Sequence, residues 1–342
     1  MNTVKSAIPV FSPDENQHFD LPVLRNWRAE RHVFKPRTRA AVQAALACQR
    51  PLLVLGEPGL GKSQLARAAA TVLGWPLVYQ VVNGRTECED LLYRFDAVAR
   101  LACAQVSGRV AASAGAQRAL GDELAPLNYV IPGVMWWAYA WSAAASQVER
   151  AGKFCGEAAD MWKSPDGWRQ DGRQGVVVLI DEIDKADSEV PNSLLEGLGT
   201  VGFQVPHGGG YVTLPEGCVP PLVIVTSNGE RDLPPAFLRR CVILRLVLPE
   251  SEEELKAELL SYAAVHFTEQ QVPLDVRAEV FAQWLADRRT ASGDDPRAGL
   301  AEFLDMLHAL HDMHPGEGAK QLELFRETHP YILGKHKQRT GE

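Results

Sequence analysis

A glycine-rich segment early in the chain has the spacing of a phosphate-binding loop. The pattern G-x-x-x-x-G-K-[ST] is filled by Gly56-Glu57-Pro58-Gly59-Leu60-Gly61-Lys62-Ser63, and Gln64 follows directly. Glycines let the backbone curl until successive N–H groups point at one anion. In such a loop Lys62 reaches the outer phosphates of a nucleotide, and the hydroxyl of Ser63 ligates Mg²⁺. The segment therefore predicts a nucleotide-binding loop from Gly56 to Gln64, with a simple glycine-rich turn as the weaker alternative.

Two acidic residues, Asp181 and Glu182, follow an apolar run from Val176 to Ile180. An uninterrupted run of this kind is typical of a buried central strand in a parallel sheet. Such a strand delivers both carboxylates to the carboxyl edge of the sheet, where open α/β sheets bind ligands. There Asp181 can support a Mg²⁺ ion, and Glu182 can orient water for phosphoryl transfer. An ordinary strand end is the alternative, and the phosphate-binding pattern argues against it.

The elements that must position these motifs have an α/β arrangement. The apolar run from Leu52 to Leu55 predicts a strand directly before the loop, and a helix is expected from Gln64 to Leu73. Across residues 31–249 predicted strands alternate with helices, which is typical of a parallel sheet covered on both faces.

The character of the sequence changes at about residue 250. Ser251 and Glu254 have the spacing of a capping box and predict a helix from Glu252 to His266. Helical spacing returns over residues 276–288 and 297–311. We therefore expect a small all-helical domain over residues 250–342, ending in a polar tail.

The motifs together resemble the AAA+ ATPases, and specifically their MoxR-like branch. The resemblance rests on Asp181-Glu182-Ile183-Asp184-Lys185-Ala186-Asp187, on Asn192-Ser193-Leu194-Leu195-Glu196 and on Asp90-Leu91-Leu92. It covers about residues 31–335, with the motifs in the order that the fold requires. It implies a P-loop NTPase αβα sandwich with a parallel sheet, followed by a small helical AAA+ lid. ATP and Mg²⁺ are the implied cofactors, and ATP rather than GTP is inferred from the resemblance alone.

The same resemblance assigns roles to polar residues elsewhere. The segment Ile224-Val225-Thr226-Ser227-Asn228 looks like the sensor-1 strand, in which Asn228 would position the attacking water. Asn83 stands where the family has a polar residue that couples substrate binding to the catalytic glutamate. Asp295-Pro296-Arg297-Ala298 resembles the sensor-2 motif of the lid, so Arg297 would touch the nucleotide of its own subunit.

An arginine finger is implied near the end of the nucleotide domain. The segment Leu233-Pro234-Pro235-Ala236-Phe237-Leu238-Arg239-Arg240-Cys241 resembles the part of the family that carries it. Arg240 is the first choice and Arg239 the second, while a solvated pair at a helix end is the alternative. Because the family's finger comes from the next subunit, the resemblance implies a ring, usually of six subunits, with active sites at the interfaces.

Composition limits the partners and the compartment. The chain has 342 residues, 46% of them hydrophobic, and a net charge of -8, which argues against a generally basic nucleic-acid surface but leaves a local basic pore open. Its six cysteines show no C-x-x-C spacing, so we expect neither zinc nor disulfides, and the reducing cytoplasm fits best. No apolar run is long enough for membrane insertion. Residues 1–30 contain several prolines and predict an irregular N-terminal arm.

Two insertions extend the nucleotide domain. The first, about residues 96–172, holds five of the eight tryptophans, which predict core packing more strongly than a docking surface. The second, about residues 201–214, predicts a hairpin around a glycine turn. Its Phe203, His207 and Tyr211 are candidate substrate contacts, although a hairpin packed on the body is equally expected.

These observations favour an ATP-driven machine that remodels or activates a client protein or inserts its cofactor. The resemblance suggests a client with a von Willebrand factor A domain, although no residue identifies that client. One alternative is an ATP-switched scaffold or adaptor, against which Glu182 and Arg240 argue. Another is the motor subunit of a nucleic-acid-directed defence or restriction complex, which the acidic composition disfavours.

Overall fold

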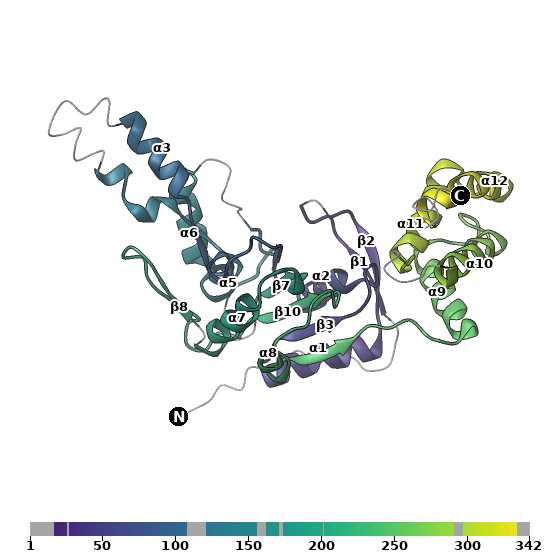
Figure 1. Ribbon diagram of the computed structural model, residues 1–342, viewed down its shortest axis with the longest axis horizontal. Coiled ribbons are helices and arrows are strands. Elements are labelled where there is room, and N and C mark those ends of the chain that lie inside the picture. Colours follow the sequence, from purple (N-terminus) through teal and green to yellow (C-terminus); the bar gives the residue numbers. More distant parts are fainter. Residues whose placement is uncertain are drawn as a thin grey trace. The chain divides into compact units, whose positions relative to one another are not determined.

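The computed structural model of the chain describes residues 17–25, 27–107, 121–155, 162–170, 174–200, 202–290 and 297–333 (Figure 1). Two compact units make up the chain. The first contains residues 37–54 and 66–244, and the second contains residues 14–36, 55–65 and 245–342. The units are therefore interleaved in sequence, because residues 55–65 belong to the second unit.

A five-stranded parallel sheet forms the centre of the α/β region. Its strand order is β11-β3-β10-β7-β4, and β7 pairs in parallel with both β4 and β10. The strands are β3 (Leu52–Leu55), β4 (Leu77–Val81), β7 (Val177–Asp181), β10 (Leu222–Ser227) and β11 (Val242–Arg245). All six residues of β10 are buried, as expected for a strand covered on both faces.

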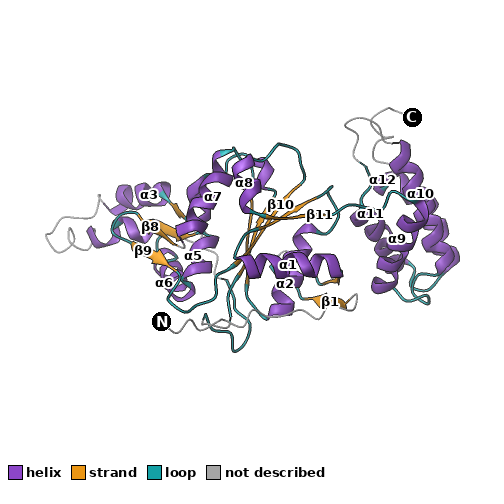
Figure 2. Cartoon of the chain, turned by 90° about the horizontal axis from the view of Figure 1, so that it is seen from below, coloured by secondary structure: helices purple, strands orange, loops and turns teal. Residues whose placement is uncertain are grey.

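Helices cover both faces of this sheet, with α7 and α8 on one side of the strands and α1 and α2 on the other (Figure 2). Their bounds are α1 (Pro36–Cys48), α2 (Lys62–Leu73), α7 (Glu189–Thr200) and α8 (Pro235–Arg240). The predicted α/β class with a parallel sheet is confirmed.

The first insertion folds as a group of short elements. It contains α3 (Ala97–Ser107), a 3-10 turn (Pro126–Tyr129), β6 (Val130–Pro132), α5 (Val134–Tyr139) and α6 (Trp141–Ala151). Strand β6 pairs antiparallel with β5 (Tyr93–Phe95), which directly precedes the insertion. Trp136, Trp137 and Trp162 are buried, and Trp141 packs edge-on between Trp137 and Trp168. The tryptophans are therefore core residues, as their spacing predicted.

The second insertion is the predicted hairpin, formed by β8 (Gly202–Val205) and β9 (Gly210–Thr213). Phe203 is buried between Tyr93 and Trp136, and the ring of His207 lies 5.0 Å from that of Phe95. Tyr211 is 57% exposed. The hairpin thus packs on the first insertion, and burial removes Phe203 as a substrate contact.

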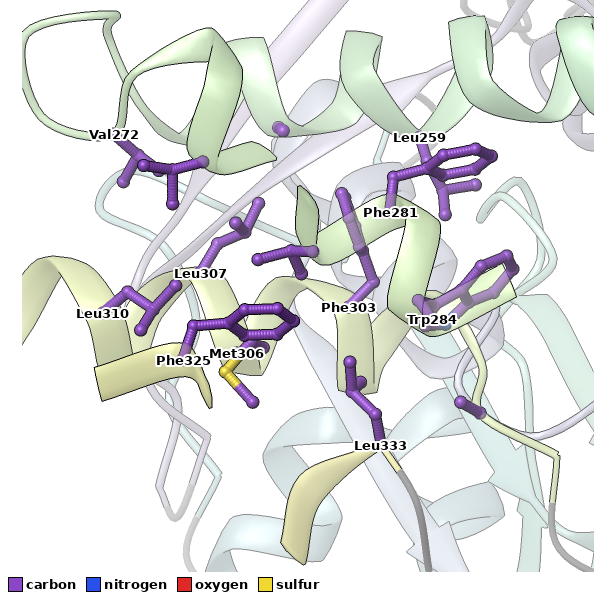
Figure 3. Close-up of a cluster of buried hydrophobic side chains, with 14 of the residues drawn as sticks. Leu259, Val272, Phe281, Trp284, Phe303, Met306, Leu307, Leu310, Phe325 and Leu333 are labelled. Atoms are coloured by element: carbon purple, nitrogen blue, oxygen red, sulfur yellow. The ribbon is translucent and has the colours of Figure 1, made fainter. Parts of the chain in front are cut away.

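The second unit is mainly helical, with α9 (Glu252–His266), α10 (Leu274–Thr290), α11 (Leu300–Met313) and α12 (Gly318–Ile332). The side chains of Leu259, Phe281, Trp284 and Phe303 lie together in its core (Figure 3). Each large apolar side chain buried in this way contributes about 1.5–3 kcal/mol to stability. The predicted helical region after the sheet is confirmed.

Two local predictions for this unit were wrong. Residues 17–21 (β1) and 30–34 (β2) form an antiparallel hairpin, where an irregular arm was expected over residues 1–30; residues 1–16 lie outside the described residues. Burial of the side chains of Leu21 and Phe34 stabilises this hairpin. Helix α9 begins at the predicted residue, yet the side chain of Ser251 makes no capping hydrogen bond.

Candidate nucleotide site

The phosphate-binding segment is a tight loop between β3 and α2. Gly59 and Gly61 have φ angles of 79° and 78°, in the left-handed region that glycine adopts without strain. A Cβ atom on Gly56 would lie 2.6 Å from the carbonyl oxygen of Leu246, so a larger residue cannot fit there without a shift of the backbone. The loop ends at Lys62, where α2 begins, and the free N–H groups of a helix N-terminus attract anions. The backbone therefore favours glycine at both glycine positions of the pattern, Gly56 and Gly61, and also at Gly59.

The side chain of Lys62 forms hydrogen bonds with the backbone of the loop. Its side chain is only 7% exposed, and Nζ donates to the carbonyl oxygens of Gly56 and Glu57, each at 2.8 Å. These two acceptors hold the ammonium group inside the curve of the loop. Gln64, in the first turn of α2, donates to the carboxylate of Glu30 on β2, so the N-terminal hairpin supports the loop.

The loop packs against the start of α11. The backbone N–H of Ala301 donates to the carbonyl oxygen of Gly59 at 3.1 Å, and a Cβ atom on Gly299 would lie 2.8 Å from the carbonyl oxygen of Pro58. Glu302 accepts a 3.0 Å hydrogen bond from the backbone N–H of Gly299 and so caps the helix. Two segments far apart in sequence thus approach each other through their backbones.

The role of Arg297, which the sensor-2 resemblance would place at the nucleotide, stays a prediction. Arg297 is exposed and stands two residues before Gly299. A second arginine, Arg288 of α10, was not predicted: it forms an ion pair with Glu57 and donates to the carbonyl oxygen of Ala298 at 3.0 Å. Its sequence position, in the last turn of a helix, gave no sign of this contact.

The acidic residues at the end of β7 are held by β10. The hydroxyl of Thr226 donates to Oδ1 of Asp181 at 2.5 Å and accepts the backbone N–H of Glu182 at 2.9 Å. Thr226 is completely buried, so this hydroxyl is a fixed link between the two acidic residues. Thr226 stands two residues before Asn228, and its type and position in the sequence predicted no role for it.

The carboxylate of Glu182 is engaged on both oxygens. Nζ of Lys185 lies 2.7 Å from Oε2, and Nδ2 of Asn228 lies 3.4 Å from Oε1. The hydrogen bond to Glu182 raises the pKa of Lys185, against the opposing effect of burial. Asn228 therefore lies beside Glu182, where a residue that positions water for this glutamate would be needed.

Asp184 fixes the segment that follows β10. This residue is only 2% exposed, and its carboxylate accepts the backbone N–H groups of Asn228 (3.2 and 3.3 Å) and Glu230 (2.9 Å). A carboxylate can accept several N–H donors, so this one side chain can bind both backbone groups. Asp184 therefore orients the backbone that carries Asn228.

Asn83 follows a residue that is bonded to the end of β7, because the backbone N–H of Val82 donates to the carbonyl oxygen of Asp181 at 2.8 Å. Asn83 accepts the backbone N–H of Arg85 at 2.8 Å and closes a turn after β4. Arg239 and Arg240 are exposed in the last turn of α8.

Within the described ranges, no helix has both the length and the apolar character needed to cross a bilayer. The same ranges contain no group of three or more His, Cys, Asp or Glu side chains arranged to hold a metal ion.

Comparison with known proteins indicates a class of domain for one part of the chain. Residues 51–123 match the family model of the AAA domain of the dynein-related subfamily, which supports an AAA+ ATPase domain that binds nucleotide. The chain matches none of the curated proteins.

Two solved structures resemble the chain at low identity. A protein proposed to be an ATPase, from Cytophaga hutchinsonii, is 12% identical over 73% of this chain and 63% of its own, with a TM-score of 0.34. NtrX from Brucella abortus, in complex with ADP, is 13% identical over 82% of this chain and 49% of its own, with a TM-score of 0.44. The chain thus spans less than two thirds of either protein, and neither likeness assigns an activity.

Proposed function

We propose that this chain is a MoxR-like AAA+ ATPase that couples ATP hydrolysis in a ring of six subunits to the remodelling, activation or cofactor loading of a client protein. The observation that carries the proposal is the network at the end of β7, in which Thr226 and Asn228 orient Asp181 and Glu182. Nucleotide hydrolases use a phosphate-binding loop and such an acidic pair to transfer a phosphoryl group to water. A client with a von Willebrand factor A domain is suggested by the family resemblance.

In this proposal each group has one task. The N–H groups of the loop and the ammonium of Lys62 bind the phosphates, so Lys62 exchanges its carbonyl acceptors for phosphate oxygens. Glu182 accepts a proton from water as the water oxygen attacks the γ-phosphorus, and ADP leaves with the bond electrons. Asn228 orients that water.

Magnesium fits the available donors. Mg²⁺ prefers oxygen ligands and keeps several waters when one or two protein groups and the phosphates hold it. The hydroxyl of Ser63 and the carboxylate of Asp181 are donors of this kind. The ion would supply charge neutralisation at the transferred phosphoryl group.

An exposed arginine completes the site from a neighbouring subunit. Arg240, or Arg239 in the adjacent register, would stabilise the charge that develops on the phosphoryl oxygens, an effect of about 10³–10⁵ in other nucleotide hydrolases. The test is ATP hydrolysis per subunit over a wide range of protein concentration. Specific activity should rise steeply and then reach a plateau. Constant activity of a verified monomer would exclude an arginine supplied in trans.

Single variants then identify the arginine. Arg240→Ala should bind ATP and hydrolyse it poorly, and a mixture with Glu182→Gln should recover activity, because each variant supplies what the other lacks. Arg239→Ala tests the alternative register, and the exposed Arg245→Ala is the matched control. Mixed rings without recovered activity would contradict the proposal.

A further inference from the structure

Strand β2 of the N-terminal hairpin contacts both the phosphate loop and helix α9. Successive side chains of a strand point to opposite faces, so Glu30 and His32 share one face and Arg31 lies on the other. Lys35 follows the strand directly. The hairpin, loop residues 55–65 and α9 all belong to the second compact unit. Contacts among these three segments can therefore be compared within one body.

One face of β2 covers the glycine that precedes Lys62. The carboxylate of Glu30 accepts a hydrogen bond from Nε2 of Gln64. An ionised carboxylate only accepts hydrogen bonds, so it selects the nitrogen end of the amide group. Oε1 of Gln64 then lies 3.3 Å from the position that a Cβ atom on Gly61 would take, and Cε1 of His32 lies 3.9 Å from the same position. Glu30 thus orients a side chain that packs on the phosphate loop.

Lys35 joins the end of the same strand to the middle of α9. Its Nζ lies 2.6 Å from Oε1 of Glu258 and 4.9 Å from the ring centre of Tyr262, one turn further along the helix. Both charged side chains are largely buried, at 33% and 23% exposed. Burial opposes the charged form of Lys35, but the hydrogen bond to Glu258 outweighs it, so the pKa of Lys35 is raised. The ion pair therefore persists at neutral pH.

Arg31 holds the end of α9. Its guanidinium donates to the carbonyl oxygen of Val265 at 2.8 Å and to Oδ1 of Asp20 on β1 at 3.0 Å. The last carbonyl groups of a helix have no partner within the helix, so an arginine at this position satisfies one of them. Helix α9 is thus attached to the hairpin at two points.

We propose that Glu30 is a positioning residue for nucleotide binding and that Lys35 couples it to α9, so that the hairpin transmits the position of this helix to the phosphate loop. The inference rests on the proposed function, because it assumes that the loop binds the phosphates of a nucleotide. The loop also meets α11 through the backbone N–H of Ala301, and variants of hairpin side chains leave that contact in place.

The test is a double-mutant cycle of Glu30→Ala and Lys35→Met, with ADP affinity measured by isothermal titration calorimetry. We expect each single variant to bind ADP about five- to ten-fold more weakly, the lower part of the range typical of coupling between two sites. The double variant should bind no more weakly than the weaker single variant, because breaking either link already interrupts the hairpin. The two positions lie about 16 Å apart along an extended strand. Independent effects at this distance would instead multiply.

Three further variants control for charge and for folding. Lys35→Arg keeps the ion pair and should bind ADP with the original affinity. Glu258→Gln removes the partner's charge from the helix side and should reproduce the loss seen in Lys35→Met. Lys320 pairs with Glu317 at 2.5 Å at the start of α12, so Lys320→Met removes an ion pair of the same helical region and should leave ADP affinity unchanged.

The outcomes separate this inference from the function on which it rests. Multiplied losses in the double variant, or normal ADP affinity in both Lys35→Met and Glu258→Gln, would overturn the coupling to α9. Normal ADP affinity in Glu30→Ala would overturn its positioning role. If Lys62→Ala bound ADP normally, the loop would not hold phosphates, and the proposed function would fail instead.

Discussion

The phosphate loop and the acidic edge of the sheet hold their charged groups by different means. In the loop, Lys62 is bonded to two backbone carbonyl groups, and the conformation depends on glycines. At the acidic edge, the side chains of Thr226, Asn228 and Lys185 hold Asp181 and Glu182. The loop should therefore be sensitive to changes of the backbone and of its one buried cation. The acidic edge should respond in a graded way to each polar side chain that is removed.

The largest effect is expected from Lys62→Ala. Removing the ammonium group should weaken ADP binding by about 100-fold, because hydrogen bonds from a charged group contribute about 1.5–3 kcal/mol. Isothermal titration calorimetry with ADP measures this loss, and the exposed Lys256→Ala is the control. Affinity within two-fold of the original value would mean that Lys62 does not hold the phosphates.

A smaller effect is expected from Thr226→Val at the acidic edge. The change keeps the volume but removes one hydrogen bond to Asp181 and leaves the backbone N–H of Glu182 without the hydroxyl acceptor. Buried polar groups without partners cost about 1–3 kcal/mol, so the free energy of unfolding should fall by this amount. Unfolding in a denaturant measures this change in the free energy of unfolding. Thr226→Ser keeps the hydroxyl and should restore most of the stability, and equal stability of the Val variant would contradict a side-chain network.

Local patterns predicted the parts of the molecule that depend on neighbouring residues. The loop pattern, the apolar strand before Asp181 and the bounds of α9 all follow from spacings of a few residues. The glycine turn likewise predicted the hairpin of β8 and β9.

The contacts that the sequence did not reveal join distant residues. Arg288 and Glu57 are 231 positions apart, and Thr226 and Asp181 are 45 apart. Nothing in the sequence near either partner encodes the other, because the chain path alone brings them together. The ion pair between Lys185 and Glu182 is local, yet Glu182 has a left-handed backbone that glycine would normally signal.

The smallest effect is expected from loss of the ion pair between Arg288 and Glu57. This loss also tests most directly whether the loop and the acidic edge are held by different means. Glu57 is about half exposed, so the pair should contribute about 0.2–1 kcal/mol, and Arg288→Ala should change ADP affinity by less than about five-fold. A double-mutant cycle with Glu57→Gln isolates the coupling between them, and the exposed pair of Arg289 and Glu252 serves as the control. If backbone contacts determine the conformation of the loop, both single variants should bind ADP almost normally. A 100-fold loss of ADP affinity in Arg288→Ala would mean that a side chain from α10 determines the conformation of the loop. The contrast with the acidic edge would then not hold.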